Sequence, residues 1–128
     1  MCSVLLVEDN PIFRKSLKKM LAFRFPGLKI GEVSDGEEAL QELENTNPDL
    51  IFMDIKLPGR NGLEVTRIIK EANSEVEVII LTSYDIPEYR EAAFKSGANH
   101  FFVKGSTASD EIANIVRSSF KQRLKARS

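Results

Sequence analysis

The stretch Asp49-Leu50-Ile51-Phe52-Met53-Asp54 is an apolar run that ends in a carboxylate. Two other stretches have the same form: residues 3–7 (Ser-Val-Leu-Leu-Val) lead into Glu8 and Asp9, and residues 100–103 (His-Phe-Phe-Val) lead into Lys104. Short runs that are apolar throughout are typical of parallel strands buried on both faces. Open sheets of such strands bind ligands just beyond the carboxyl ends of the strands. The three runs therefore predict carboxylates and an ammonium group at one edge of a parallel sheet.

Strand-like and helix-like segments alternate five times along the chain, and the expected strands are residues 3–7, 28–33, 49–53, 76–81 and 100–103. A segment with apolar residues at helical spacing follows each strand. Cap and turn residues separate them, with Asn10-Pro11 before the first helix and Gly97 at the end of the fourth. The alternation predicts one (βα)5 domain over residues 1–128, a parallel sheet with helices on both faces.

The composition is that of an ordinary globular domain, with 128 residues, 42% apolar residues and 29% charged residues. A net charge of -1 gives no general attraction to nucleic acid or to an anionic membrane. The single cysteine, Cys2, cannot form an internal disulfide, and the sequence contains no apolar run long enough for a membrane span. These features favour a cytoplasmic location and no membrane partner.

The residues at the strand ends suit a divalent cation and a phosphoryl group. Mg²⁺ prefers oxygen ligands, which Asp9, Asp54 and a backbone carbonyl just after Asp54 can supply, while Glu8 can hold a metal-bound water. A carboxylate beside such a cation can attack a phosphoryl donor. The Lys104 ammonium and the Thr82 hydroxyl suit phosphoryl oxygens. Each of these residues is commonplace alone, but together they stand at the ends of four of the five expected strands, and this combination indicates a site.

Four stretches carry a resemblance to a known family: residues 5–10 (Leu-Leu-Val-Glu-Asp-Asn), 53–62 (Met-Asp-Ile-Lys-Leu-Pro-Gly-Arg-Asn-Gly), 81–83 (Leu-Thr-Ser) and 101–105 (Phe-Phe-Val-Lys-Gly). With them the chain resembles, over nearly its whole length, the receiver domains of bacterial two-component response regulators. The Lys-Gly-Ser of residues 104–106 is similar to receivers that precede a helix-turn-helix output domain. The resemblance implies a flavodoxin-like fold with strand order 2-1-3-4-5.

The resemblance also implies a chemistry. Asp54 would accept a phosphoryl group from the phosphohistidine of a sensor kinase or phosphotransfer protein. Asp9, Asp54 and the Lys56 carbonyl would ligate Mg²⁺, and Glu8 would act through water. Thr82 and Lys104 would contact the phosphoryl oxygens. The protein would be a regulatory phospho-acceptor that catalyses only its own phosphorylation and dephosphorylation.

A conformational switch follows from the same match. Phe101 stands three positions before Lys104, in the place of the family's aromatic switch residue. Thr82 would move toward the phosphoryl group, the ring would turn inward, and the face made by the fourth helix, fifth strand and fifth helix would change. That face would support homodimer formation or partner docking. DNA would be contacted only through an output domain, and none is expected within residues 1–128, whether the protein is a single-domain regulator or part of a longer one.

Three positions need separate treatment. Gly105 follows the lysine where many family members have proline, which leaves the conformation of the Lys104-Gly105 peptide open. Lys56 and Tyr84 lie two positions after Asp54 and Thr82, where family members tune dephosphorylation. These two side chains could shield the acyl phosphate or hold the attacking water, or they could simply be solvated loop residues.

Two other functions compete with the switch. One is a degenerate receiver that acts only as an interaction module, although no acceptor or acid-pair residue is missing. The other is a phosphatase of the haloacid dehalogenase type, which forms an aspartyl phosphate. Such enzymes typically place a second aspartate two residues after the nucleophile, and here Lys56 stands there. They also carry a substrate-binding cap, for which 128 residues leave little space.

Overall fold

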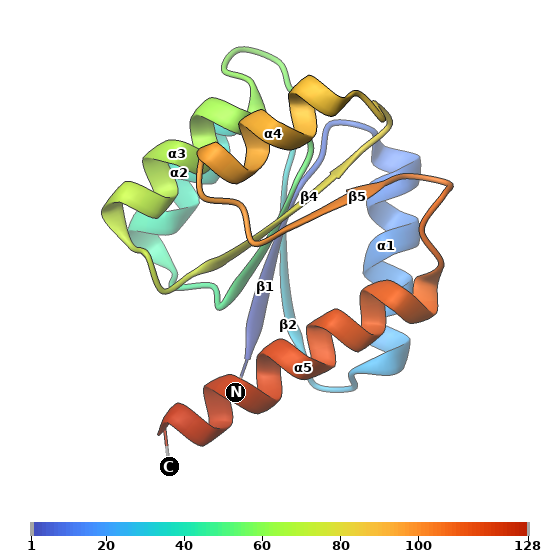
Figure 1. Ribbon diagram of the computed structural model, residues 1–128. Helices are drawn as coiled ribbons and strands as arrows, with labels where there is room; N and C mark the ends of the chain where they lie inside the picture. The colour runs from blue at the N-terminus through green and yellow to red at the C-terminus, as the bar shows by residue number, and fades with distance from the viewer. Residues whose placement is uncertain (1, 128) are drawn as a thin grey trace.

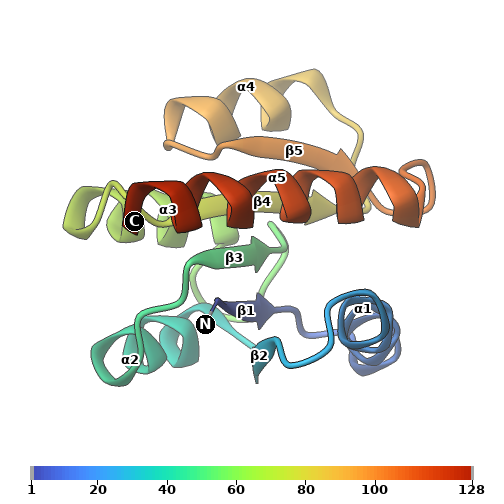
Figure 2. The same cartoon turned by 90° about the horizontal axis from the view of Figure 1, so that it is seen from below.

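Five parallel strands form one sheet in the order β2-β1-β3-β4-β5. In the computed structural model, which describes residues 2–127, the strands are β1 (Ser3–Val7), β2 (Lys29–Val33), β3 (Leu50–Met53), β4 (Glu77–Thr82) and β5 (His100–Val103). Figure 2 shows them stacked in this order, with β2 and β5 at the two edges. The strand order that the resemblance implies is confirmed.

Helices cover both faces of the sheet (Figure 1). They are α1 (Pro11–Arg24), α2 (Gly36–Asn45), α3 (Gly62–Ala72), α4 (Pro87–Lys95) and α5 (Ser109–Arg127). The helices α2, α3 and α4 pack on one face, and α1 and α5 pack on the other. The (βα)5 architecture expected from the alternation is therefore the one observed.

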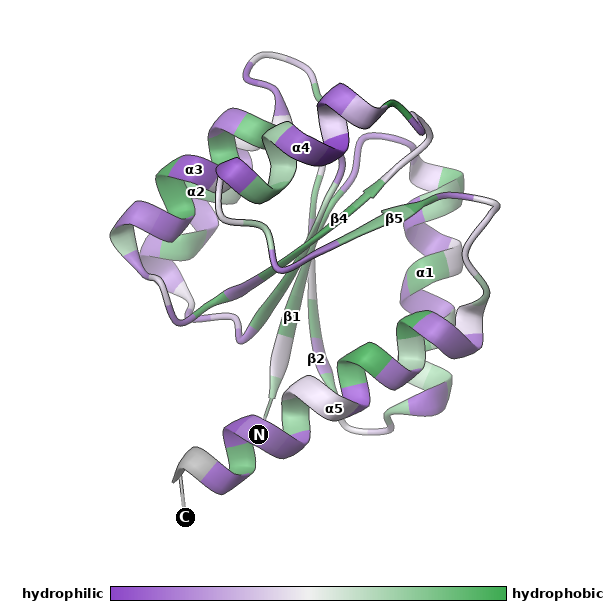
Figure 3. Ribbon diagram, in the orientation of Figure 1, coloured by the Kyte–Doolittle hydropathy of each residue, from purple (hydrophilic) through white to green (hydrophobic). Residues whose placement is uncertain are grey.

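Each face of the sheet has its own hydrophobic layer, because successive strand residues point to opposite sides. In β1, Leu5 and Val7 join the layer under α2, α3 and α4, whereas Val4 and Leu6 join the layer under α1 and α5. All four residues of β3 are buried. In Figure 3 the central strands β1 and β3 are mainly hydrophobic, as continuous apolar runs require, whereas the edge strand β2 contains the polar residues Lys29 and Glu32.

Side-chain caps begin three of the helices directly beyond the strand ends. The Asn10 side chain accepts hydrogen bonds from the backbone N–H groups of the first turn of α1, and Pro11 follows it. Asp35 and Asn61 cap α2 and α3 in the same way. Gly97, with φ of 103°, follows the end of α4 as its expected C-terminal glycine. The Asn10, Asp35 and Asn61 caps fix the helix starts at the carboxyl edge of the sheet, whereas Gly97 ends α4 at the opposite edge, before β5.

Four strand boundaries differ from the expected ones by one residue, namely both ends of β4 and the first residues of β2 and β3. β4 runs to Thr82, since Thr82 pairs with Val103 of β5, whereas Val76 lies outside the ladder. The carbonyl of Val76 instead accepts a hydrogen bond from the Lys70 ammonium at 2.7 Å. β2 begins at Lys29 rather than at residue 28, and β3 begins at Leu50 rather than at residue 49. The first shift places Thr82 inside the sheet, where its backbone is fixed.

Among residues 2–127, no helix combines the length and the apolar composition that crossing a membrane would require.

Candidate functional site

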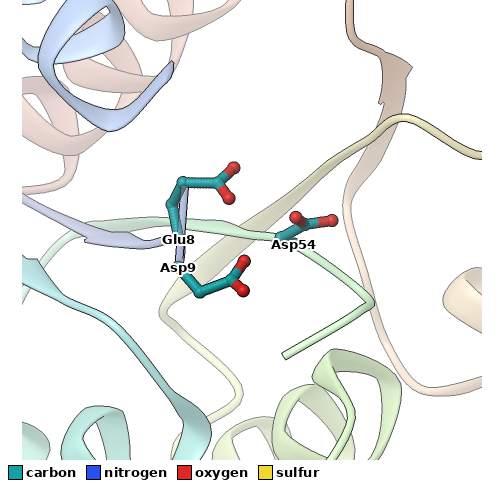
Figure 4. Close-up of side chains that lie close together, drawn as sticks. All are labelled: Glu8, Asp9 and Asp54. Carbon is teal, nitrogen blue, oxygen red and sulfur yellow. The ribbon is translucent and has the colours of Figure 1, made fainter. Parts of the chain in front are cut away.

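Three carboxylates meet beyond the ends of β1 and β3. One oxygen from each of Glu8, Asp9 and Asp54 lies within 4.8 Å of the others, and Figure 4 shows the three groups around one small volume. The backbone places them: the N–H of Asp54 donates to the carbonyl of Val7 at 3.1 Å, so the parallel pairing continues past the strand end. The sheet edge therefore brings together the acids that the strand-end pattern predicted.

Lys104 reaches the same volume from β5. Its Nζ lies 3.1 Å from Asp54 Oδ2 and 2.5 Å from Glu8 Oε1. The backbone N–H of Lys104 donates to the carbonyl of Thr82 at 2.8 Å, which fixes the strand end. The Lys104-Gly105 peptide is trans, like every peptide bond in the described residues, and Gly105 has a φ of 81°. The ammonium reaches Asp54 without the proline that many receivers have.

Burial and the neighbouring charges shift the pKa values of the groups in this cluster. Burial raises the pKa of Glu8 above its ordinary value of 4.5, and the Asp54 charge adds to the rise, although hydrogen bonds from Lys104 and Asn10 oppose it. Burial alone would lower the pKa of Lys104, but the hydrogen bonds and charges of Glu8 and Asp54 more than reverse this and raise it. The lysine is therefore an ammonium at neutral pH, and it offsets repulsion between the two acids.

Asp54 and Glu8 are held by further contacts. The backbone N–H of Ile55 donates to Asp54 Oδ1 at 2.7 Å. An Arg14 guanidinium nitrogen donates to the carbonyl of Glu8 at 2.7 Å. At Gly62, a Cβ atom would lie 1.9 Å from the Asp54 carbonyl oxygen, so only glycine fits there. The motif of residues 53–62 thus contains a glycine on which the position of Asp54 depends.

The hydroxyl of Thr82 lies at the end of β4. The residue is fully buried, and its Oγ1 accepts a long hydrogen bond of 3.4 Å from the backbone N–H of Tyr84. The Thr82 oxygen accepts that bond, so the hydroxyl can still donate its hydrogen to another acceptor.

Phe101 is a buried core residue, 5% exposed, in the layer under α2, α3 and α4. The guanidinium carbon of Arg90, from α4, lies 4.7 Å from its ring centroid. The aromatic ring therefore lies in the inward position, and the Arg90 guanidinium packs against it from α4.

Lys56 is an exposed residue whose side chain turns toward α4. Its Nζ lies 5.4 Å from the ring centroid of Tyr84 and 5.3 Å from that of Tyr89. A hydrogen bond with Tyr89 is the main cause of a raised pKa at Lys56. Lys56 and Tyr84, which the sequence pairs only by their spacing from Asp54 and Thr82, are thus in contact.

Four contributors to the site were not singled out by the sequence pattern: Phe13, Arg14, Gly62 and Tyr89. Gly62 ends the stretch of residues 53–62 that carries the family resemblance, and the Pro, Gly and Asn residues of that stretch are typical of a tight turn, so a signal for a close approach was present. The Phe13 ring lies 4.5 Å from Lys104 Nζ, and it reads from sequence as an ordinary helix residue. Arg14 and Tyr89 depend on how α1 and α4 pack on the sheet, which local spacing does not encode.

The donor set fits a hard divalent cation. Carboxylate oxygens are the preferred ligands of Mg²⁺, and three of them gather here with one residue exposed to solvent and two buried. Asp9 is the exposed member, so a cation bound through it can keep several waters. The residues present therefore suit magnesium.

Comparison with known proteins gives one family. Residues 4–117 match the response regulator receiver domain. The chain is 33% identical over 114 residues to the transcriptional regulatory protein DegU of Brevibacillus brevis, covering 89% of this chain and 48% of DegU. The chain thus spans about half the length of the curated relatives it matches.

Solved structures agree on the fold. A CheY-like receiver domain protein from Methanospirillum hungatei JF-1 superposes with a TM-score of 0.89 at 22% identity, covering 98% of both chains. A LuxR-family two-component response regulator from Aurantimonas sp. SI85-9A1 gives a TM-score of 0.83 at 29% identity, covering 92% of this chain and 84% of that one. The family match, the relatives and the strand order all agree: this chain belongs to the receiver domain family of two-component response regulators.

Proposed function

We propose that this receiver domain is a phospho-acceptor switch in which Asp54 takes a phosphoryl group from a sensor histidine kinase or a phosphotransfer protein. One observation carries the proposal: the Lys104 ammonium contacts both Asp54 and Glu8, with Asp9 beside them. A nucleophilic carboxylate, a cation for the incoming phosphoryl oxygens and an acidic set for Mg²⁺ are thereby in one place.

The transfer uses the chain's own residues. An oxygen of Asp54 forms a bond to phosphorus as the bond between phosphorus and the donor histidine nitrogen breaks, and the nitrogen keeps the electron pair. The Ile55 N–H holds the Asp54 carboxylate in place through Oδ1. Lys104 exchanges its contact with the free carboxylate for one with a phosphoryl oxygen. Thr82 then moves to donate its hydroxyl to another.

Magnesium, when bound, would reduce the repulsion between the carboxylates and the anionic donor. Asp9, Asp54 and the Lys56 carbonyl would hold it, with Glu8 acting through water. Lys56 and Tyr84 would tune how long the phosphoryl group survives. The domain would act as a regulator rather than as an enzyme that turns over a substrate.

The read-out lies on the face made by α4, β5 and α5. The Phe101 ring is already buried in this structure and lies against Arg90 of α4, so the expected inward turn is not needed, and we expect movement of Thr82 toward the phosphoryl group to alter the packing around a ring that stays buried. Phosphorylation can shift the equilibrium between two arrangements of this face only if the phosphoryl group makes different contacts in the two arrangements. We propose that this face docks a partner, a second copy of the chain or the output domain of a longer regulator. Any contact with DNA would be made by that output domain.

The test is the intact mass of the protein after incubation with a small phosphodonor such as acetyl phosphate, with and without Mg²⁺. We expect one phosphoryl group per chain, dependent on Mg²⁺ and absent from Asp54→Asn. Asp49→Asn is the matched control, because Asp49 lies beside the opposite end of the same strand and its carboxylate bonds to the Ser3 N–H. It should label like the unaltered protein.

The outcomes separate the alternatives. No adduct under any condition would leave an interaction module, and labelling of Asp54→Asn would place the acceptor elsewhere. Sustained hydrolysis of a generic phosphomonoester would indicate a phosphatase.

A further inference from the structure

The Lys56 ammonium lies against a pair of tyrosine rings that come from different elements. Tyr84 is in the loop after β4, and Tyr89 is the third residue of α4. Their centroids are 5.4 and 5.3 Å from the ammonium, and the two rings meet edge to face, with centroids 6.1 Å apart. All three side chains are therefore in mutual contact. We call Lys56, Tyr84 and Tyr89 the clamp.

The clamp connects the two loops that begin at the reacting residues. Asp54 opens the loop after β3, which carries Lys56, and Thr82 ends β4, which is followed by Tyr84. Tyr89 adds the first turn of α4 to this pair. That turn has no side-chain cap, because Ile86 occupies the N-cap position. The side chains of Asn10, Asp35 and Asn61 cap α1, α2 and α3. The start of α4 has no such side-chain hydrogen bond and is instead connected to the neighbouring loops by the contacts of the clamp.

We propose that Tyr89 is a positioning residue that sets the lifetime of the phosphoryl group by holding Lys56 and Tyr84 together across the mouth of the site. This inference rests on the proposed phosphorylation of Asp54 and extends it to a residue that the motif does not contain. In the loss of the group, water forms a bond to phosphorus and the bond from phosphorus to the Asp54 oxygen breaks. The carboxylate keeps the electron pair, a proton passes to solvent, and inorganic phosphate leaves.

We expect the clamp to slow this reaction because the loops that carry Lys56 and Tyr84 begin at Asp54 and Thr82, so holding these loops together restricts the approach of water to phosphorus. A lysine that is free of the rings moves with its loop and leaves this approach open. A lysine held by two rings keeps both loops together. Contacts between a cation and aromatic rings at exposed sites are individually weak, so the expected effects are several-fold rather than absolute.

The experiment measures the first-order loss of phosphoryl label from the whole protein after removal of the donor, in the presence of Mg²⁺. Tyr89→Leu removes the ring, and we expect the decay to become about three- to fivefold faster. Tyr89→Phe keeps the ring but loses the hydroxyl that hydrogen-bonds to Lys56, so its decay should lie between that of the unaltered protein and that of Tyr89→Leu. Phe94→Leu is the control, because Phe94 is an exposed aromatic residue on the same helix, outside the clamp.

A double variant distinguishes positioning from a general effect on folding. Lys56→Met removes the cation, and in that background Tyr89→Leu should change the decay by less than about 1.5-fold, since the ring has no ammonium left to hold. An equal effect of Tyr89→Leu in both backgrounds would overturn the inference, as would an unchanged decay in Tyr89→Leu itself.

Failure of this inference is separable from failure of the proposed function. Normal Mg²⁺-dependent labelling of Asp54 with unaltered decay in Tyr89→Leu rejects only the clamp. Absence of labelling in the unaltered protein rejects the phospho-acceptor function, and the lifetime inference falls with it.

The Lys56 side-chain proton resonances give a readout without phosphorylation: ring currents should shift them upfield, and Tyr89→Leu should reduce that shift. Unshifted Lys56 resonances would also overturn the clamp.

Discussion

Asp54 owes its position to a residue that carries no side chain. The backbone of Gly62 donates to the carbonyl of Ile55 at 2.8 Å and packs directly against the Asp54 carbonyl. The hydroxyl of Thr66 donates to the Gly62 carbonyl at 2.7 Å and fixes the glycine from the other side. The start of α3 therefore packs against the backbone of Asp54 and fixes the position from which its side chain extends.

We predict that Gly62→Ala is severely destabilising. The new Cβ would lie 1.9 Å from the Asp54 carbonyl oxygen and 2.8 Å from its carbon, and backbone atoms cannot rotate away. We expect the free energy of unfolding, measured by urea denaturation, to fall by at least about 3 kcal/mol.

Gly59→Ala is the control for this prediction. Gly59 has a φ of 76°, but no atom lies within 4 Å of its added Cβ. Only the left-handed backbone conformation should therefore cost stability, about 1–2 kcal/mol. A Gly62→Ala protein that is as stable as Gly59→Ala would contradict the close approach.

At the scale of the elements, α1 is joined to the edge strand β2 by one acid and two bases. Glu32 of β2 accepts from Lys18 at 2.9 Å and from Arg14 at 3.3 Å, both on α1. The hydrogen bond from Lys18 is the main cause of a lowered pKa at Glu32, and Arg14 adds to it. Because Arg14 also donates to the Glu8 carbonyl, this junction is connected to the acidic site.

We predict a pH-dependent loss of stability in Glu32→Gln. A carboxyl group whose pKa is lower in the folded than in the unfolded state stabilises the fold above its ordinary value of 4.5, and this contribution disappears as the pH falls through the lowered pKa. We expect the variant to be less stable by about 0.5–1 kcal/mol at neutral pH and equal to the unaltered protein in acid.

Urea denaturation at several pH values would check this. Glu71→Gln, which breaks an exposed pair with Arg67 within α3, is the control, and it should lose less than about 0.5 kcal/mol. A difference between Glu32→Gln and the unaltered protein that stays constant into acid would contradict the assigned ion pairs.

Elements of this fold were predictable to the extent that their signals are local. The apolar runs ending at Asp54 and Lys104 identify strands, because a strand buried on both faces has no polar side. The boundary of β4 was displaced by a residue because pairing of Thr82 with Val103, a tertiary contact, decides where the ladder ends. The strand order came from the family resemblance, since alternation alone predicts parallel strands but not their sequence in the sheet.

The site divides in the same way. The acids at strand ends were predictable, because the fold brings carboxyl ends of parallel strands to one edge. The contacts of long side chains were not, since Lys104 and Lys56 each have several rotatable bonds and their partners lie on distant segments. Lys104 forms ion pairs with Glu8 as well as with Asp54, and Lys56 contacts Tyr89 on α4. Such choices depend on packing between elements rather than on spacing along the chain.

At the scale of the whole molecule, the central strands that contribute to both hydrophobic layers also carry the acidic residues at their carboxyl ends. β1 and β3 lie in the middle of the sheet, and they carry Glu8, Asp9 and Asp54 beyond their ends. Two of these acids are buried, so their mutual repulsion acts against the folded state as a whole. A cation at this edge should therefore stabilise the entire domain.

We predict that Mg²⁺ raises the free energy of unfolding. Binding to the folded state alone contributes about 2.7 kcal/mol when free Mg²⁺ is one hundred times its dissociation constant. Thermal or urea denaturation at increasing Mg²⁺ should show the rise, and a chelator should reverse it.

Asp9→Asn and Glu71→Gln give the matched comparison for this effect. Asp9→Asn should lose most of the Mg²⁺ dependence, because it removes the exposed carboxylate of the acidic set. Glu71→Gln, far from that set in the sequence and on the outside of α3, should keep it. Equal stability with and without Mg²⁺ in the unaltered protein would contradict a cation site at this edge.

The central claim is that Asp54 itself becomes the acyl phosphate, and borohydride reduction followed by peptide mass mapping tests it most directly. Borohydride converts an aspartyl phosphate to homoserine and leaves a free aspartate unchanged, so the product marks the acceptor. After treatment with a phosphodonor and Mg²⁺, the account predicts homoserine at position 54 and aspartate at positions 9 and 49. Homoserine at another position, or none in a protein that has gained a phosphoryl group, would contradict it.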